Sequence, residues 1–282
     1  MLMAFYAHHT GQPNVAYNYL GSAIRLAYSS GINRNLDEAA VPTSKIQSAR
    51  RTWWTLYSLE SELCMEYGRP LCIRETDSVA SYPQQILDPS DSRSKITFIV
   101  VMAKFGRIVR KIIDLVSNID EKSIEIESFV GRMMNHQAEL MAWREELPVH
   151  LQIRNSEGSV NRTTFDFQCA EIELRFNRVM LMMHRPFFAY KNFSSPFYTS
   201  SMARIVCLGA AQETLTIFFK ARLSLLEKSF YYHRVIAAAL VILTIAFDSP
   251  LEEKCHLLET CSKSVKLFED MQSNFSNFGT AI

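Results

Sequence analysis

The run Arg50-Arg51-Thr52-Trp53-Trp54 opens a stretch that continues without interruption to Gly68-Arg69-Pro70. Between these two ends, Trp53, Leu56 and Leu63 recur at three- and four-residue steps, which place them on one face of an α-helix. Gly68 and Pro70 then supply a stop, because glycine tolerates a left-handed backbone and proline cannot continue a helix. The stretch therefore predicts a long amphipathic helix with a rigid end.

The same helical periodicity extends over most of the chain and predicts an all-α fold, an irregular multi-helix bundle. Thr43 or Ser44 is expected to cap the helix that ends at Tyr67, and Gly31 to end an earlier one. The expected helices span 2–9, 14–30, 44–67, 92–117, 123–147, 164–184, 196–220, 230–247 and 251–270. We predict one helical domain over 1–282, with residues 150–163 as a candidate exposed linker because they are polar and rich in turn-forming residues.

Composition limits the function classes. A chain of 282 residues that is 48% hydrophobic can bury a sizeable core, and a net charge of +1 lacks the basic excess of most domains that bind nucleic acid alone. The six cysteines are scattered, without the spacing of a zinc site, and indicate a reducing compartment. The most apolar run, Val235 to Phe247, is too short to span a bilayer, so a buried core helix is expected and a membrane partner is not.

One carboxylate stands out in the long helix. Glu60 lies on the same mostly apolar stripe as Trp53 and Leu56, where a buried charge needs a partner. Arg50, Arg51 and Arg69 are the nearest cations in the sequence, and a bidentate arginine would offset the desolvation of the carboxylate. We expect an internal clamp between this helix and the loop after it, and contact with a ligand or partner is the alternative.

A second motif, His184-Arg185-Pro186, is predicted to end the helix over 164–184. Cationic side chains suit the carbonyl groups at the C-terminal end of a helix, and proline stops the next turn. Metal binding by His184 is disfavoured, because no second ligand stands at a helical offset from it.

Enzyme motifs are missing from the sequence. It contains no G-x-S-x-G, P-loop, G-x-G-x-x-G or H-E-x-x-H pattern, so no catalytic residue, cofactor-binding residue or metal ligand is predicted. An all-α terpene cyclase is the remote enzyme alternative, but its magnesium ions would need a carboxylate cluster on a helix. The acidic doublets of this chain are isolated, and we expect a protein that is not an enzyme.

Several short stretches, read in order, carry a resemblance that covers most of the chain. Together with the motifs already quoted, they resemble the fungal-specific transcription factor domain, the middle homology region of zinc binuclear cluster regulators. The stretches are Ala23-Ile24-Arg25-Leu26-Ala27, Gly31-Ile32-Asn33-Arg34, Arg50 to Glu60, Gly68-Arg69-Pro70, Tyr82-Pro83, Met183-His184-Arg185-Pro186-Phe187 and Cys207-Leu208-Gly209-Ala210-Ala211.

The resemblance implies an all-helical, nuclear regulatory region that controls target-gene expression, including metabolic or secondary-metabolite genes, and often restrains activation until an inducer or partner releases it. It also implies partners among other transcription regulators or a second copy of the chain, and a small-molecule effector in some members. The sequence departs from the family in lacking a Cys-x2-Cys-x6-Cys cluster. Zinc, and DNA contact through it, are therefore expected only in a missing N-terminal domain. Glu60 and Ser61 are smaller departures, at positions where the family usually shows Asp and a basic residue.

Two roles remain open at this point. The chain is either the regulatory region of a transcription regulator, truncated by its gene model or with the zinc cluster encoded elsewhere, or a stand-alone interaction module that modulates other regulators without binding DNA. A neutral chain without a base-reading element is expected to bind duplex DNA weakly at most.

Overall fold

A computed structural model describes the chain over residues 1–84, 95–117, 119, 125–152, 164–189, 195–220 and 232–247, and at 254–255, 257–259, 261–262 and 266. Within these ranges the regular structure is helical, apart from one isolated bridge between Ser195 and Tyr198. The predicted all-α fold is confirmed. The chain divides into two compact units, Met1–Ile119 with Arg132–His150, and Asp120–Gly131 with Leu151–Ile282. A division of this kind is compatible with one domain or with two, so the single domain stays a prediction.

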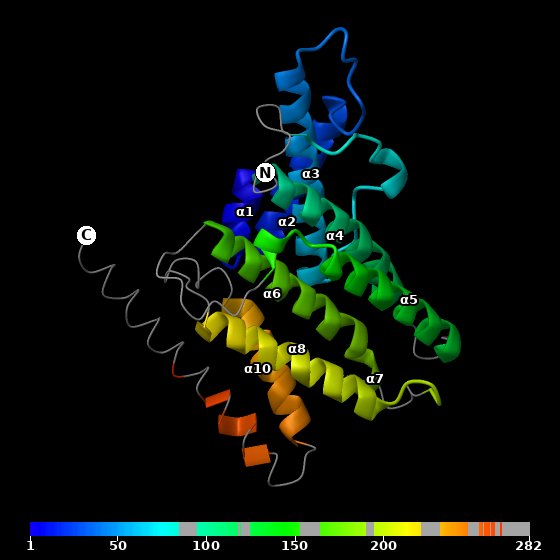
Figure 1. The fold of residues 1–282 in the computed structure, drawn as a ribbon, viewed down its shortest axis with the longest axis vertical. Coiled ribbons are helices and arrows are strands. Elements are labelled where there is room, and N and C mark those ends of the chain that lie inside the picture. The colour runs from blue at the N-terminus through cyan, green and yellow to red at the C-terminus, as the bar shows by residue number, and fades with distance from the viewer. Residues whose placement is uncertain are drawn as a thin grey trace, which may run out of the picture. The chain divides into compact units, whose positions relative to one another are not determined.

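The first unit is built on a long helix, α3, with shorter helices on either side (Figure 1). Its elements are α1 (Leu2–His9), α2 (Pro13–Ser29), α3 (Thr43–Tyr67), the 3-10 turn η1 (Glu75–Asp77), α4 (Lys95–Ser117), most of α5 (Ile126–Glu145) and part of the turn η2 (Val149–Leu151). α1 packs on α2, α2 on α3, and α3 on α4. Trp143 joins α5 to α4, because its indole Nε1 donates to the carbonyl of Val101 at 3.2 Å.

The second unit is organised around α8, which packs against both α6 and α10. Its helices are α6 (Thr164–His184), α7 (Pro186–Ala189), α8 (Ser200–Lys220) and α10 (Tyr232–Phe247). By length and composition alone, Ser200–Phe219 in α8 could cross a membrane. Its packing against two neighbouring helices favours a core helix instead.

The helix boundaries agree closely with the periodicity, with a few differences at the ends. Thr43 and Ser44 do not cap α3, because Pro42 occupies the N-cap position and no side chain bonds the free amides. α8 begins at Ser200 rather than near residue 196, and the one-turn helix α7 was not predicted. Gly31 has φ +69° and ends the α2 region in the left-handed conformation, as expected. Most of the candidate linker 150–163 and of the last predicted helix lies outside the described residues.

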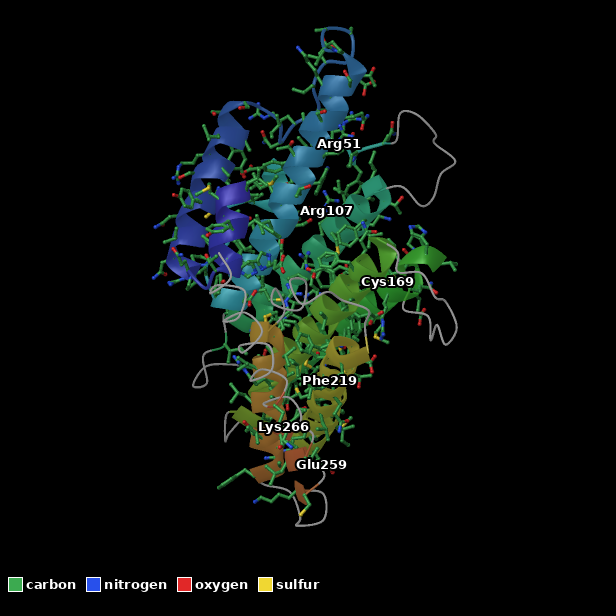
Figure 2. All side chains as sticks on the ribbon, turned by 90° about the vertical axis from the view of Figure 1, so that its left-hand side faces the viewer. Arg51, Arg107, Cys169, Phe219, Glu259 and Lys266 are labelled. Carbon is green, nitrogen blue, oxygen red and sulfur yellow. The ribbon has the colours of Figure 1, made fainter. Side chains whose placement is uncertain are left out.

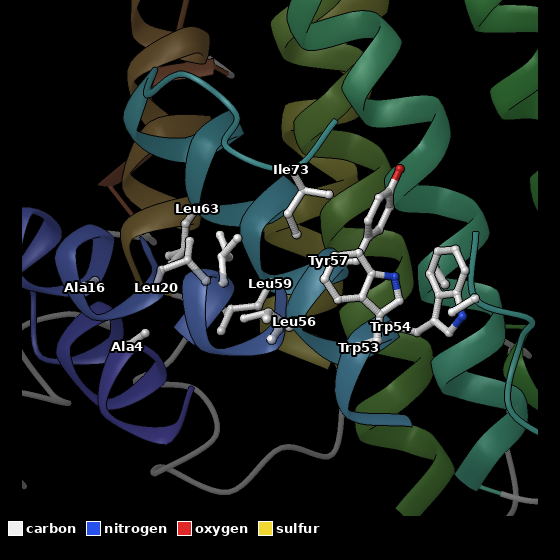
Figure 3. Close-up of a cluster of buried hydrophobic side chains, with 14 of the residues drawn as sticks. Ala4, Ala16, Leu20, Trp53, Trp54, Leu56, Tyr57, Leu59, Leu63 and Ile73 are labelled. Carbon is white, nitrogen blue, oxygen red and sulfur yellow. The ribbon is translucent and has the colours of Figure 1, made fainter. Parts of the chain in front are cut away.

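The core of the first unit gathers around the two adjacent tryptophans (Figure 3). Trp53 and Trp54 are both fully buried, and so is Tyr57 one turn later. The same cluster contains Leu56 and Leu63 of α3, Leu20 and Ala16 of α2, and Ala4 of α1. The apolar stripe read from the sequence is therefore the surface that joins α3 to α2.

Candidate functional site

Glu60 sits at the centre of the first unit, with no exposed surface. Its Oε1 accepts a hydrogen bond from the backbone N–H of Cys72 at 2.6 Å and a second from Ile73 at 3.1 Å. Both donors belong to the loop that follows α3, so the predicted clamp between the long helix and this loop is confirmed. A buried carboxylate that accepts two backbone N–H groups is far less costly than an isolated one.

The cation that pairs with Glu60 is Arg110 of α4, and the prediction of Arg50, Arg51 or Arg69 was wrong. The Arg110 Nη2 contacts Glu60 Oε2 directly, while its Nη1 donates to the carbonyl of Ile73 at 2.9 Å. Arg110 is only 5% exposed. The sequence offers a partial signal for it, because α4 is amphipathic and Arg110 lies beside the buried apolar residues Val109 and Ile113. An arginine in its middle must then find an acceptor inside the core.

The three arginines that were expected at Glu60 bind elsewhere. Arg50 Nη2 pairs with Glu38 Oε1 at 3.1 Å. Arg51 donates to the hydroxyl of Ser48 at 3.0 Å on the same helix. Arg69 donates to Asn14 Oδ1 at 2.7 Å, which ties the end of α3 to the start of α2. Sequence proximity misled the prediction, because Arg50 and Arg51 lie more than two helical turns before Glu60 and Arg69 lies beyond the end of α3.

Close approach of α3 and α4 makes the Arg110 contact feasible. A Cβ at Gly106 would stand 3.2 Å from both Ser61 Oγ and Tyr57 Cε1, so a larger residue there would have to displace one of them. One turn later the Arg110 guanidinium stacks on the Tyr57 ring, with Cζ 3.9 Å from the ring centroid. Burial raises the pKa of the Tyr57 hydroxyl, which donates to Glu75 Oε2 at 2.5 Å.

A second arginine of α4 reaches the tryptophan pair. Arg107, labelled in Figure 2, places its Cζ 5.1 Å from the Trp54 ring centroid and 5.4 Å from that of Tyr82. Its Nε lies 2.9 Å from Glu75 Oε1. Trp54 Nε1 donates to the carbonyl of Ser81 at 3.0 Å, so its ring also anchors the loop. The Trp53 Nε1, by contrast, is buried and has no hydrogen-bond partner among the described residues.

The segment 72–84 is held along its length rather than at one point. Asn33 donates to the carbonyl of Asp77 at 2.8 Å, and Asn35 accepts from the N–H of Ser81 at 2.8 Å. Gln47 Oε1 of α3 accepts from the N–H of Gln84 at 2.6 Å. The stretches Gly31 to Arg34 and Tyr82-Pro83, which carried part of the resemblance, therefore belong to one arrangement with Glu60 at its centre.

Gly68-Arg69-Pro70 forms the rigid end that the sequence predicted. Gly68 has φ +61°, a left-handed conformation that ends α3 and that other residues adopt only with strain. The carbonyl of Pro70 accepts from the hydroxyl of Tyr17 at 2.9 Å and from the thiol of Cys64 at 3.4 Å. The turn directs the chain back so that Cys72 and Ile73 can meet Glu60.

His184 in the second unit does not act as a cationic cap, and this correction follows from its burial. The ring is fully buried, and desolvation lowers the pKa of His184 from 6.5 to about 4, so it is neutral at physiological pH. Its Nδ1 lies 2.6 Å from the hydroxyl of Tyr198, whose pKa burial raises. Arg185 is exposed, and Pro186 begins α7 instead of simply ending a helix. Glu60 and His184 lie in different units.

The contacts of Glu60 and His184 are structural in kind. Glu60 is saturated by protein donors, and the hydrogen bond of His184 goes to a tyrosine rather than to a nucleophile. A small pocket of about 170 Å³ lies between α4 and the end of α5, lined mainly by Val100, Val101, Trp143 and Leu147, with Lys104 and Glu146 beside them. That volume suits a few water molecules rather than a drug-sized ligand.

The cysteines of this sequence do not have the Cys-x2-Cys-x6-Cys spacing. All six are free, and four are buried on different elements. Burial raises the pKa of the Cys64 thiol to about 12 and that of Cys207 also to about 12, so both thiols are protonated at physiological pH. Among the side chains that the structure describes, no cysteine belongs to a group that could hold a metal ion.

Comparison with known proteins finds relatives that are named as regulatory proteins or transcription factors. An uncharacterized transcriptional regulatory protein of Schizosaccharomyces pombe is 23% identical over 263 residues, which cover 90% of this chain and 32% of that protein. The acetamidase regulatory protein of Aspergillus fumigatus is 23% identical over 241 residues, which cover 84% of this chain and 30% of that protein. An ABC-transporter-regulating transcription factor of the same species is 20% identical over 192 residues, which cover 65% of this chain and 21% of that protein.

The chain spans about a third of the length of these curated relatives, or less. No solved structure matches it significantly. The model of the fungal-specific transcription factor domain matches residues 1–145, a little more than half of the chain. This match contains α1 to α5 with Glu60, Arg110 and the loop that they hold. The chain therefore belongs to the family of the fungal-specific transcription factor domain.

Proposed function

We propose that this chain is the regulatory region of a nuclear, fungal transcription regulator of the zinc-cluster type, and that it acts by protein contacts rather than by catalysis. The family match over residues 1–145 carries the proposal, and relatives named as transcriptional regulators support it. The acetamidase and ABC-transporter regulators suggest small metabolic or transport gene sets as the kind of target.

DNA contact, in this proposal, belongs to another part of the regulator. The net charge of this chain is +1, and its described cysteines do not fit a zinc cluster. Domains that read DNA neutralise several phosphates with Lys and Arg and place side chains on base edges. The zinc of the DNA-reading cluster would therefore be held by a separate domain.

The clamp suggests how such a region could act. Glu60 and Arg110 hold the 72–84 segment against α3 and α4, which gives the first unit a fixed surface for a second copy, another regulator or the remaining domains of the same protein. A regulatory region that restrains activation needs such a fixed surface, because restraint depends on a specific contact between folded parts.

A reporter assay tests the proposal. The chain would be inserted between an unrelated zinc-cluster DNA-binding domain and an activation domain, and compared with a flexible linker of equal length. We expect the chain to change reporter output relative to the linker, and we expect Glu60→Ala, which breaks the clamp, to return output toward the linker value. Equal output from the chain and the linker would contradict a regulatory role.

Two further readouts complete the test. A tagged copy of the native regulator should concentrate in the nucleus, and the isolated chain should show no specific duplex binding at physiological salt. Specific DNA binding by the isolated chain would contradict the division of labour proposed here. Glu38→Ala changes an exposed charge and serves as the control. If Glu38→Ala changes reporter output as much as Glu60→Ala does, the assay does not report on the folded unit.

A further inference from the structure

Three side chains with metal-binding atoms meet where α1 lies against the end of α3. His8 comes from the last turn of α1, and Glu62 and Glu66 come from the last two turns of α3. Their potential ligand atoms, one per residue, all lie within 4.8 Å of one another. His8 is 4% exposed and Glu62 is 6% exposed, so this is not a solvated acidic surface.

The backbone already gives these groups the spacing of a metal site. Glu62 and Glu66 are four residues apart on one helix, so their carboxylates project from the same face one turn apart. Two ligands at this spacing, completed by a third from another element, are a common way for proteins to bind zinc. His8 supplies that third ligand from α1.

The distance between the ring and the nearer carboxylate agrees with a shared ion. His8 Nε2 lies 3.6 Å from Glu66 Oε2, which is longer than a good hydrogen bond. Two ligands at about 2.1 Å from one tetrahedral ion stand about 3.4 Å apart. The separation of His8 Nε2 and Glu66 Oε2 is therefore close to that of two ligands of one ion, and the potential ligand atom of Glu62 lies within 4.8 Å of both.

The other ring nitrogen of His8 is oriented by a neighbour. Its Nδ1 lies 2.6 Å from the hydroxyl of Tyr67, which follows Glu66 on α3. Metal-binding histidines usually use the second ring nitrogen in a hydrogen bond that fixes the tautomer and the ring direction. In the tautomer with Nδ1–H donating to Tyr67, Nε2 is the ring nitrogen that can coordinate a metal ion, and it faces the side of α3 that carries Glu66.

We propose that His8, Glu62 and Glu66 bind a divalent transition-metal ion, Zn²⁺ in the first place, and that this ion fastens α1 to the end of α3. One imidazole and two carboxylates balance the charge of the ion. Imidazole favours zinc and related transition metals over Mg²⁺ and Ca²⁺, which prefer oxygen ligands. The site is separate from any DNA-reading zinc cluster and does not depend on the proposed transcriptional role.

An ion at this site would affect how α1 is attached to the rest of the first unit. α1 has only eight residues, too few to be stable alone in water, and it buries only Ala4, Ala7 and His8. Leu2 and Tyr6 are 79% and 63% exposed. Because the apolar contact is small, an ion that joins His8 to α3 would control how firmly this helix is docked.

Zinc uptake by the full chain, stripped of metal by a chelator and kept reduced, tests the proposal directly. Competition against a chromophoric zinc indicator should show one tight site. Loss of one ligand, in Glu62→Gln or Glu66→Gln, should weaken binding by at least about 10-fold, and Tyr67→Phe by about 10-fold, since second-shell partners contribute about 10- to 100-fold. The glutamine variants keep the side-chain shape, which protects the fold.

Matched controls separate this site from other zinc-binding groups. His136 and Glu139 form a histidine–glutamate pair on α5, with 3.8 Å between Nδ1 and Oε2, and His136→Gln should leave zinc binding unchanged. Cys72→Ser and Cys255→Ser remove the two exposed thiols and should also leave it unchanged. Zinc binding that survives the Glu62→Gln/Glu66→Gln double variant, or that is lost in a cysteine variant, would overturn the proposal.

Hydrogen exchange supplies a second readout that simple uptake does not give. Zinc should slow amide exchange in residues 2–9 of the wild-type chain and should not do so in Glu66→Gln. The absence of a tight site, or zinc binding without slower exchange in α1, would contradict the proposed link between the ion and helix docking. Mg²⁺ at the same concentration should leave exchange unchanged, and an equal effect would contradict the assignment of a transition metal.

Discussion

Glu60 in the first unit and His184 in the second are both fully buried titratable groups, yet they are accommodated in opposite ways. Glu60 is surrounded by donors, namely two backbone N–H groups and the Arg110 guanidinium. Among the described residues, His184 has one hydrogen-bond partner, the Tyr198 hydroxyl, and its low pKa keeps it neutral. The difference shows that a buried charge requires a network drawn from distant elements, whereas a buried neutral group needs only a local partner.

The largest expected effect comes from breaking the network around Glu60. Glu60→Ala leaves the Arg110 guanidinium buried without its carboxylate and removes the acceptor for Cys72 and Ile73. We expect the free energy of unfolding to fall by about 3–5 kcal/mol, measured by urea denaturation with circular dichroism. Glu38→Ala is the control, because Glu38 pairs with Arg50 but is 75% exposed, and it should cost less than about 1 kcal/mol. Similar losses in both variants would contradict a specific role for burial.

Loss of apolar packing next to the clamp should lower the free energy of unfolding almost as much. Trp54→Ala removes a fully buried ring and its hydrogen bond to Ser81, and we expect a loss of about 3–5 kcal/mol in the free energy of unfolding. Phe197→Ala, at a ring that is 75% exposed, is the aromatic control and should change stability by less than about 0.5 kcal/mol. Unchanged stability in Trp54→Ala would show that the tryptophan pair does not support the core.

The neutral state of His184 predicts a dependence of stability on pH. Because the pKa is about 4 when folded and 6.5 in the ordinary state, the unfolded chain binds a proton between these values that the folded chain does not. The contribution of the neutral His184 ring to the free energy of unfolding is therefore complete above pH 6.5. It is lost as the pH falls toward 4, by up to about 3 kcal/mol. His184→Gln should remove this part of the pH dependence, and the difference between the two unfolding curves isolates it. Parallel curves at all pH values would contradict a neutral buried ring.

The smallest effect is expected from the partner of His184. Tyr198→Phe keeps the ring but removes the hydroxyl, which leaves Nδ1 of His184 buried without its hydrogen bond, at a cost of about 1–3 kcal/mol. Thermal unfolding at pH 7 measures the change. Tyr6→Phe is the control, because Tyr6 is 63% exposed and its hydroxyl can bond water. A loss as large as that of Glu60→Ala would remove the distinction between the two sites.

Local sequence rules recovered the helices and much of the clamp, since both depend on residues close in the chain. The stripe of Trp53 and Leu56, the left-handed Gly68 and the return of the loop to Glu60 all follow from helix geometry and the rules for helix ends. The tertiary partner did not follow, because Arg110 lies 50 residues from Glu60 and α4 could be placed only by its packing on α3.

His184 shows a second limit of sequence rules. The capping rule for a basic residue at a helix end is local, but burial is a property of the packed structure and reverses the expected charge. The short helix α7 was missed for a related reason, because Pro186 was read only as a stop although proline is equally suited to the first turn of a helix.

The placement of the tryptophans has a practical consequence for optical measurements. The chain has three, and Trp53, Trp54 and Trp143 all belong to the first unit. Intrinsic indole emission therefore reports on that unit alone, whereas circular dichroism sums the helices of both. Emission and dichroism curves that coincide during unfolding would identify one cooperative transition, and curves that separate would show that the unit around His184 melts independently of the unit around Glu60.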